Sequence, residues 1–132
     1  MEERVELRAM SFVRNYYETR GWKAENVSHT RGAHGGYDFL LTKDSEQLKV
    51  EVKGCCRPYG IPDQYHSEFD ESTRRLIADV LCVVYFLNSE PPKLAIIPRD
   101  SIPPEYIVPK RRYRISGKFK NEKTIRQFLV ET

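Results

Sequence analysis

The chain has 132 residues and a formal net charge of +3, with 39% hydrophobic and 31% charged residues. This size suits one domain with a buried core, and the apolar content excludes a disordered chain. The longest apolar run, residues 80–87, is too short to span a membrane, and three cysteines do not form a disulfide framework. We therefore expect a cytoplasmic domain over residues 1–132, with a core at about 1–97 and a basic extension at about 98–132.

The N-terminal segment predicts an amphipathic helix over residues 2–20, which Gly21 ends. Its apolar residues recur at helical spacing: Val5, Ala9, Phe12, Val13, Tyr16 and Tyr17. Residues 22–28 follow as a short strand, and the glycine-rich residues 31–36 are expected to form a loop.

Two strands joined by a turn come next, over residues 37–42 and 47–53. We expect an antiparallel hairpin. Because side chains alternate along a strand, Val50 and Val52 should enter the core while Glu51 and Lys53 share the opposite face. Gly54 is expected to close the second strand.

The middle of the chain predicts a loop over residues 55–66 and a helix over 67–79, with Phe69, Leu76, Ile77 and Val80 along one stripe. Residues 81–87 are apolar on both alternating faces, which is typical of a strand near the middle of a sheet.

The last third contains a strand over residues 93–97 and a short edge strand over 113–116. Asn121 should cap a final helix. The buried face of that helix is expected to carry Ile125, Phe128 and Leu129.

Glu6 in the first helix, Gly36-Tyr-Asp38 at the start of one strand and Glu51-Val-Lys53-Gly54 at the end of the next form a recognisable series. The series resembles the PD-(D/E)xK nuclease superfamily over about residues 6–87, although Tyr37 stands where the name of the motif has proline. The resemblance implies an α/β fold with a restriction-endonuclease-like αβββαβ core. It further implies a mixed central sheet flanked by helices, here with a C-terminal helix.

The resemblance also implies a Mg²⁺-dependent endonuclease, with Mn²⁺ as a substitute, that hydrolyses phosphodiester bonds in DNA. Asp38, Glu51 and the Val52 carbonyl would be the metal ligands, because Mg²⁺ prefers hard oxygen donors and keeps several waters. Lys53 would orient the attacking water or offset developing negative charge, and Glu6 would act from the helix. An E-x-K triplet alone is a weak signal, since alternating charges are common on exposed strand faces.

Basic residues in three segments are candidates for nucleic-acid contacts, because Lys and Arg neutralise backbone phosphates. The candidates are His29, Arg31, His34, Arg57, Lys110, Arg111, Arg112, Arg114 and Lys118. Cleavage of a duplex needs two active sites, so we expect a homodimer.

Two other functions fit the same residues. In the first, the chain is a non-catalytic nucleic-acid-binding module that keeps a nuclease fold and uses its basic C-terminal segment. In the second, it is an interaction or structural domain in which the E-x-K triplet is accidental.

Overall fold

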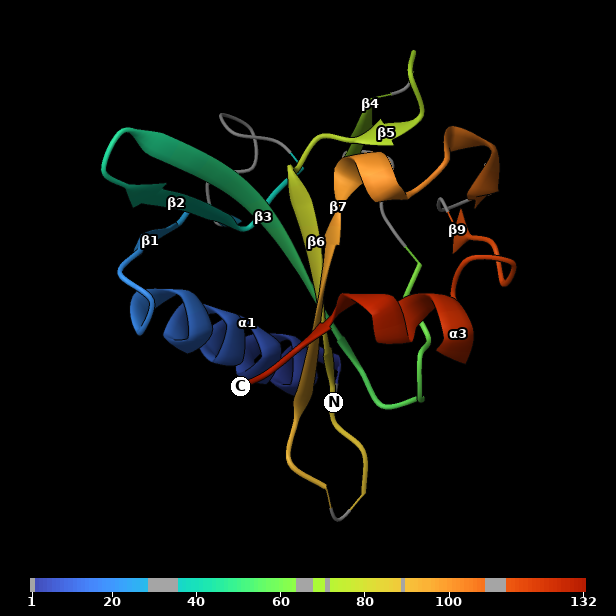
Figure 1. Ribbon diagram of the computed structural model, residues 1–132, viewed down its shortest axis with the longest axis horizontal. Helices are drawn as coiled ribbons and strands as arrows, with labels where there is room; N and C mark the ends of the chain where they lie inside the picture. Colours follow the sequence, from blue (N-terminus) through green and yellow to red (C-terminus); the bar gives the residue numbers. More distant parts are fainter. Residues whose placement is uncertain (1, 29–35, 64–67, 71, 89, 109–113) are drawn as a thin grey trace.

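A computed structural model describes residues 2–28, 36–63, 68–70, 72–88, 90–108 and 114–132 (Figure 1). The elements in chain order are α1 (Glu2–Glu18), β1 (Lys23–Asn26), β2 (Phe39–Lys43), β3 (Glu46–Cys55), β4 (Phe69–Asp70), β5 (Arg75–Leu76), β6 (Val80–Tyr85), β7 (Lys93–Pro98), η3 (Arg99–Ser101), η4 (Pro104–Tyr106), β8 (Ile107–Val108), β9 (Arg114–Ile115), α3 (Glu122–Ile125), η5 (Arg126–Phe128) and β10 (Leu129–Val130).

The described strands form a six-stranded sheet in the order β1-β2-β3-β6-β7-β10, with two separate two-stranded pairs, β4-β5 and β8-β9. β3 and β6 run parallel, and the other neighbours in the large sheet run antiparallel. The expected hairpin is confirmed as β2-β3, and the apolar run does form an inner strand, β6. The fold is therefore mixed α/β with a mostly sheet core, as the predicted mixed sheet required.

α1 covers one face of this sheet and confirms the first predicted helix. Its residues Ala9, Val13 and Tyr17 pack against Val50 and Val52 of β3. Gly21, shortly after the end of α1, has the left-handed backbone conformation, with φ at +90°. That conformation suits a residue without a side chain, so the C-terminal position predicted for this glycine is correct.

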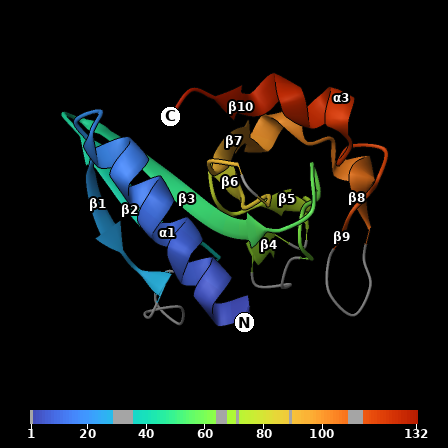
Figure 2. The ribbon, with the colours of Figure 1, turned by 90° about the horizontal axis from the view of Figure 1, so that it is seen from below.

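The opposite face of the sheet is covered by the second half of the chain. Leu81 and Val83 of β6 pack there with Ile115 of β9 and Ile125 of α3. Figure 2 shows α1 on one side of β3 and α3 with β8 and β9 on the other. Each face of the sheet thus has its own apolar cluster.

The helix predicted over residues 67–79 is wrong, because β4 and β5 form a hairpin there. The Asp70 carboxylate accepts hydrogen bonds from the backbone N–H groups of Ser72 and Thr73, at 2.9 and 3.2 Å. Arg74 then takes a positive φ of 58°, which ends any helical path. Between Phe69 and Leu76 the predicted helical face needs an apolar residue, but the chain has Ser72 and Thr73 there. A tight turn forms in place of the helix.

Further corrections concern the ends of elements. The strand predicted at 113–116 is β9, which pairs with β8 rather than lying at an edge of the large sheet. β3 continues through Gly54 to Cys55. The last helix, α3, has only four residues before η5 and β10. No helix within the described ranges is long and apolar enough to cross a membrane.

The cap of that last helix is as predicted. The Asn121 side chain accepts a hydrogen bond from the Thr124 N–H at 3.0 Å. Of the three residues expected on its buried face, Ile125 is fully buried, whereas Phe128 and Leu129 are partly buried beyond the helix end.

Candidate functional site

Asp38 is held directly against β3. It lies just before β2, where its backbone N–H donates to the Val50 carbonyl at 2.8 Å. Its Oδ2 accepts a hydrogen bond from the Val52 N–H at 2.9 Å. The antiparallel register of β2 and β3, which pairs Phe39 with Val50, therefore fixes the Asp38 carboxylate beside the middle of β3.

Lys53 lies between two carboxylates. Its Nζ is 3.2 Å from Glu51 Oε2 and 3.2 Å from each carboxylate oxygen of Glu68. We call Asp38, Glu51, Lys53 and Glu68 the acid-lysine cluster. All four are buried, with exposed fractions of 2, 4, 8 and 6%. Charged side chains are almost never buried to this extent unless they are paired. Buried ionisable groups of this kind are common in functional sites.

Burial opposes the charged forms of both predicted metal ligands. Burial raises the pKa of Asp38. The hydrogen bonds that Asp38 makes with Val52 and Glu51, and the charge of Lys53, lower this pKa but do not outweigh burial. Burial also raises the pKa of Glu51 well above its usual value, and the charges of Asp38 and Glu68 raise it further. The surroundings of both carboxylates thus favour their protonated forms in the metal-free protein.

Lys53 is in the opposite situation. Burial alone lowers the pKa of an ammonium group, but here the carboxylates of Glu51 and Glu68 outweigh burial and raise the pKa of Lys53. Lys53 is therefore positively charged at neutral pH.

The alternation predicted along β3 is confirmed. Val50 and Val52 are fully buried in the apolar cluster under α1, whereas Glu51 and Lys53 point to the other side of the strand. Glu6 lies on α1 and is half-buried. Among the described residues the structure shows no hydrogen bond or ion pair between Glu6 and the acid-lysine cluster, so its role stays a prediction.

Glu68 was missed by sequence reasoning. It stands just before β4, in the segment predicted to be a helix, where an acid near a helix start has an ordinary explanation. Sequence position gives no signal that it would contact Lys53. Only the parallel pairing of β3 with β6 and the hairpin that precedes β6 bring it there.

Two of the predicted nucleic-acid residues, Arg57 and Arg114, lie near Lys120. Arg57, Arg114 and Lys118 are exposed. Burial lowers the pKa of Lys120, and the charges of Arg114 and Arg57 lower it further, although Asp63 opposes them. Arg57 and Arg114 each lie close enough to Lys120 to act on its charge, and we call these three residues the basic trio.

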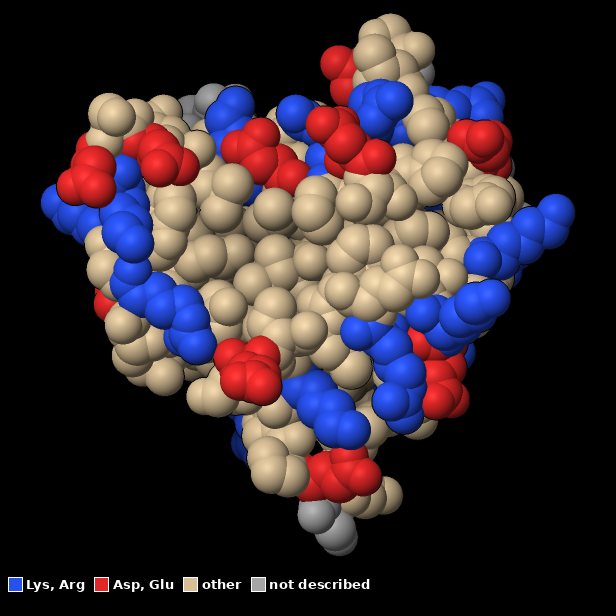
Figure 3. Space-filling model, viewed as in Figure 1, with Lys and Arg blue, Asp and Glu red and all other residues tan. Residues whose placement is uncertain are grey.

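The remaining residues predicted to contact nucleic acid belong to two other segments. His29, Arg31, His34, Lys110, Arg111 and Arg112 lie outside the described residues. On the face shown in Figure 3, Lys and Arg side chains gather over the region of α3, with acidic side chains between them.

The carboxylates of the acid-lysine cluster carry hard oxygen donors of the kind that Mg²⁺ and Mn²⁺ prefer. Across the described ranges, no three or more His, Cys, Asp or Glu side chains are grouped so as to hold a metal ion. A cation here would therefore rest on the carboxylates of Asp38 and Glu51, with the Val52 carbonyl and water completing the shell. Asp38 and Glu51 are buried carboxylates and Asp38 is fixed against the Val52 backbone, so hard oxygen donors that fit such a cation are present.

Fold and site together define a mixed α/β domain with a buried acid-lysine cluster on its central strands. The family described as "Protein NO VEIN, C-terminal" matches residues 5–97, which include the whole cluster, and the chain belongs to this family. Searches of curated proteins and of solved structures find no match.

Proposed function

We propose that this chain is a metal-dependent nuclease of the PD-(D/E)xK type that hydrolyses phosphodiester bonds in DNA. The observation that supports the proposal best is the burial of Asp38, Glu51 and Lys53 in one cluster, with Asp38 just before β2 and the other two on β3. Two buried carboxylates that are costly to ionise add little to stability, even beside a charged lysine. The same groups are well suited to bind a cation and a phosphate. The αβββ order of α1 to β3 and the parallel strand β6 are compatible with the restriction-endonuclease-like core.

Each residue has a separate task in this proposal. A divalent cation, when bound, supplies a Lewis acid for the scissile phosphate and lowers the pKa of water. Asp38 and Glu51 would hold it, and the Val52 N–H fixes the Asp38 carboxylate in position through its 2.9 Å hydrogen bond. The Lys53 ammonium, held at neutral pH in its charged form, orients the attacking water and stabilises the charge that develops on the phosphate.

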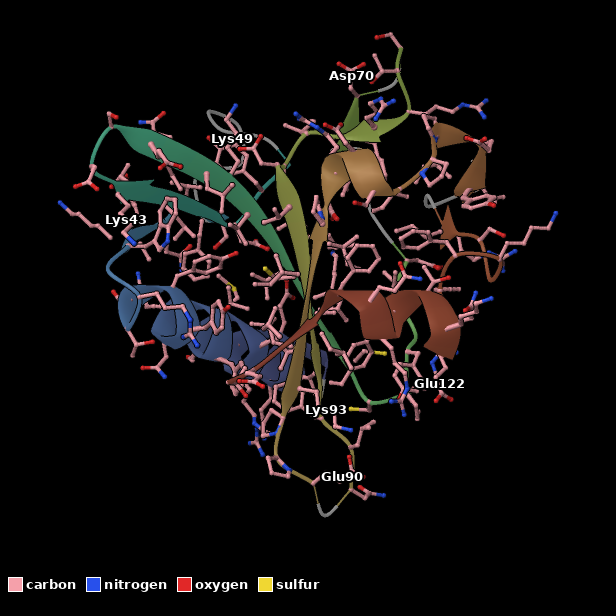
Figure 4. All side chains as sticks on the ribbon, viewed as in Figure 1. Lys43, Lys49, Asp70, Glu90, Lys93 and Glu122 are labelled. Carbon is pink, nitrogen blue, oxygen red and sulfur yellow. The ribbon has the colours of Figure 1, made fainter. Side chains whose placement is uncertain are left out.

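The experiment is a cleavage assay with Mg²⁺ or Mn²⁺ on duplex, branched and single-stranded DNA and on RNA. Lys53→Ala should reduce cleavage by about 100-fold or more, as expected for loss of a group that acts in the transition state. Lys93→Ala is the matched control, because Lys93 is exposed near the β6-β7 turn, where it pairs with Glu90 (Figure 4). The proposal fails if every substrate stays intact or if both variants cut equally.

A non-catalytic nucleic-acid-binding module is the second candidate. One observation favours it: Lys53 already has two carboxylate partners, so the acid-lysine cluster has an internal ion pair without any ligand. The basic trio would then provide the contacts with phosphates. This function predicts binding that weakens steeply with salt and no cleavage under any metal condition.

A homodimer is part of the proposal, because each chain offers one acid-lysine cluster and a duplex has two strands to cut. Sedimentation equilibrium of the protein with and without duplex DNA measures the stoichiometry. A dimer on the duplex agrees with double-strand cleavage, whereas a monomer limits the enzyme to one strand at a time.

A further inference from the structure

Glu68 reaches the acid-lysine cluster from outside the motif. Its backbone carbonyl accepts a hydrogen bond from the Ile77 N–H at 3.0 Å, and the hairpin that follows it buries Phe69 and Leu76 in the core. The fold therefore holds Glu68 in place next to Lys53, whose Nζ lies 3.2 Å from both of its oxygens.

The charges of the acid-lysine cluster suggest why an extra carboxylate is there. When all four residues are ionised, three carboxylates and one ammonium carry a formal charge of −2, and this charge is buried. One divalent cation would make the cluster neutral. Without Glu68, the same cation beside Lys53 would leave a buried positive charge, which is costly in a low-dielectric site.

Lys53 also competes with a cation for Glu51. The Glu51 Oε2 atom is 3.2 Å from Lys53 Nζ, so Lys53 occupies the side of a carboxylate that is proposed as a metal ligand. With Glu68 as a second partner at the same distance, Lys53 keeps an ion pair when Glu51 turns to the cation.

We infer that Glu68 is a positioning residue that keeps the Lys53 ammonium paired and in place while Glu51 binds the divalent cation. This inference rests on the proposed function. It assigns Glu68 no contact with the cation: Glu68 acts through Lys53, and its effect must therefore disappear when Lys53 is absent.

The test is a calorimetric titration of the folded protein with Mn²⁺ alone. Glu68→Gln should weaken Mn²⁺ binding by about tenfold or more, as removal of a partner of the ligand shell commonly does. Lys53→Met combined with Glu68→Gln should bind Mn²⁺ about as tightly as Lys53→Met alone and more tightly than Glu68→Gln alone, because the ammonium that competes for Glu51 is gone. The matched control is Glu90→Gln, which removes a carboxylate from an exposed Glu-Lys pair and should leave binding unchanged.

Four outcomes are informative. A double variant that binds as weakly as Glu68→Gln overturns the inference and makes Glu68 a direct ligand, and unchanged binding by Glu68→Gln overturns it as well. If Glu68→Gln does not fold, Lys53→Met alone decides: tighter binding than wild type supports the inference, and equal or weaker binding overturns it. Wild-type protein that binds no Mn²⁺ overturns the proposed function together with the inference, so the two failures are distinguishable.

Discussion

At the scale of single residues, Glu51 has an environment that opposes its charge. It is buried and lies near the carboxylates of Asp38 and Glu68, and these effects raise its pKa well above the usual value of 4.5. A buried acid of this kind lowers stability at neutral pH, which is a known cost of functional sites.

We predict that Glu51→Gln stabilises the metal-free protein at pH 7 by about 1 kcal/mol. Because the pKa of Glu51 is raised in the folded state, folding favours its protonated form. The stability that protonated Glu51 contributes is complete below the pKa of Glu51 in the unfolded chain. It is lost as pH rises through the higher pKa of Glu51 in the folded protein. Thermal unfolding at pH 4 to 8 measures this, and the gain over wild type should shrink as pH falls. Equal unfolding curves at every pH contradict it.

Three members of the acid-lysine cluster were predicted from the sequence, and the structure shows the same strand alternation and hairpin on which the prediction depended. Glu51 and Lys53 share a face because strand side chains alternate, and Asp38 meets them because a short turn fixes the register of β2 on β3. Glu68 could not be predicted, because its approach to Lys53 depends on tertiary packing rather than on a local pattern.

At the scale of elements, the contact of α1 with β3 depends on Gly54. A Cβ at this position would lie 2.6 Å from Val5 Cγ1 and 3.0 Å from the Val5 carbonyl oxygen. The helix can therefore approach the strand that carries Glu51 and Lys53 only because this residue has no side chain.

Gly54→Ala is predicted to destabilise the protein by about 1–3 kcal/mol, because the new methyl group forces α1 away from β3. Gly117→Ala is the control, since a Cβ at Gly117 meets no atom within 4 Å and should change stability by less than about 0.5 kcal/mol. Urea unfolding of both variants measures the difference. Similar midpoints for the two would show that the close contact is not needed.

Elements with a clear period were predictable, and the element at residues 67–79 was not. β6 has apolar residues on both faces and α1 has a helical stripe, so both patterns indicate one structure only. The segment around Asp70 has too few apolar residues to decide. There the hydrogen bonds from Ser72 and Thr73 to the Asp70 carboxylate favour a turn.

At the scale of the whole molecule, the basic trio joins segments that are far apart in sequence. Arg57 follows β3, Arg114 belongs to β9 and Lys120 precedes α3. Burial lowers the pKa of Lys120 and the charges of Arg114 and Arg57 lower it further, so positive charge gathers here, and this suits a surface that meets an anion.

We predict that substitution of Arg57, Arg114 or Lys120 by Ala weakens DNA binding at low salt. Each substitution should reduce the slope of log affinity against log salt by about one, if each side chain meets one phosphate. Lys43→Ala is the control, because this exposed lysine lies at the β2-β3 turn (Figure 4). Fluorescence anisotropy at several salt concentrations gives the slopes. A slope that stays the same in all three variants means that the basic trio does not contact DNA.

The central claim is that the acid-lysine cluster is a metal-dependent hydrolytic centre. The most direct measurement is the single-turnover rate of DNA cleavage against Mg²⁺ concentration, for wild type and Asp38→Asn, a change that keeps the shape of the side chain. Wild type should show a saturable dependence on Mg²⁺, and Asp38→Asn should lose about 100-fold or more in rate, because the cation has lost a charged ligand. Cleavage that persists in a metal chelator, or an Asp38→Asn variant with the wild-type rate, would contradict the claim.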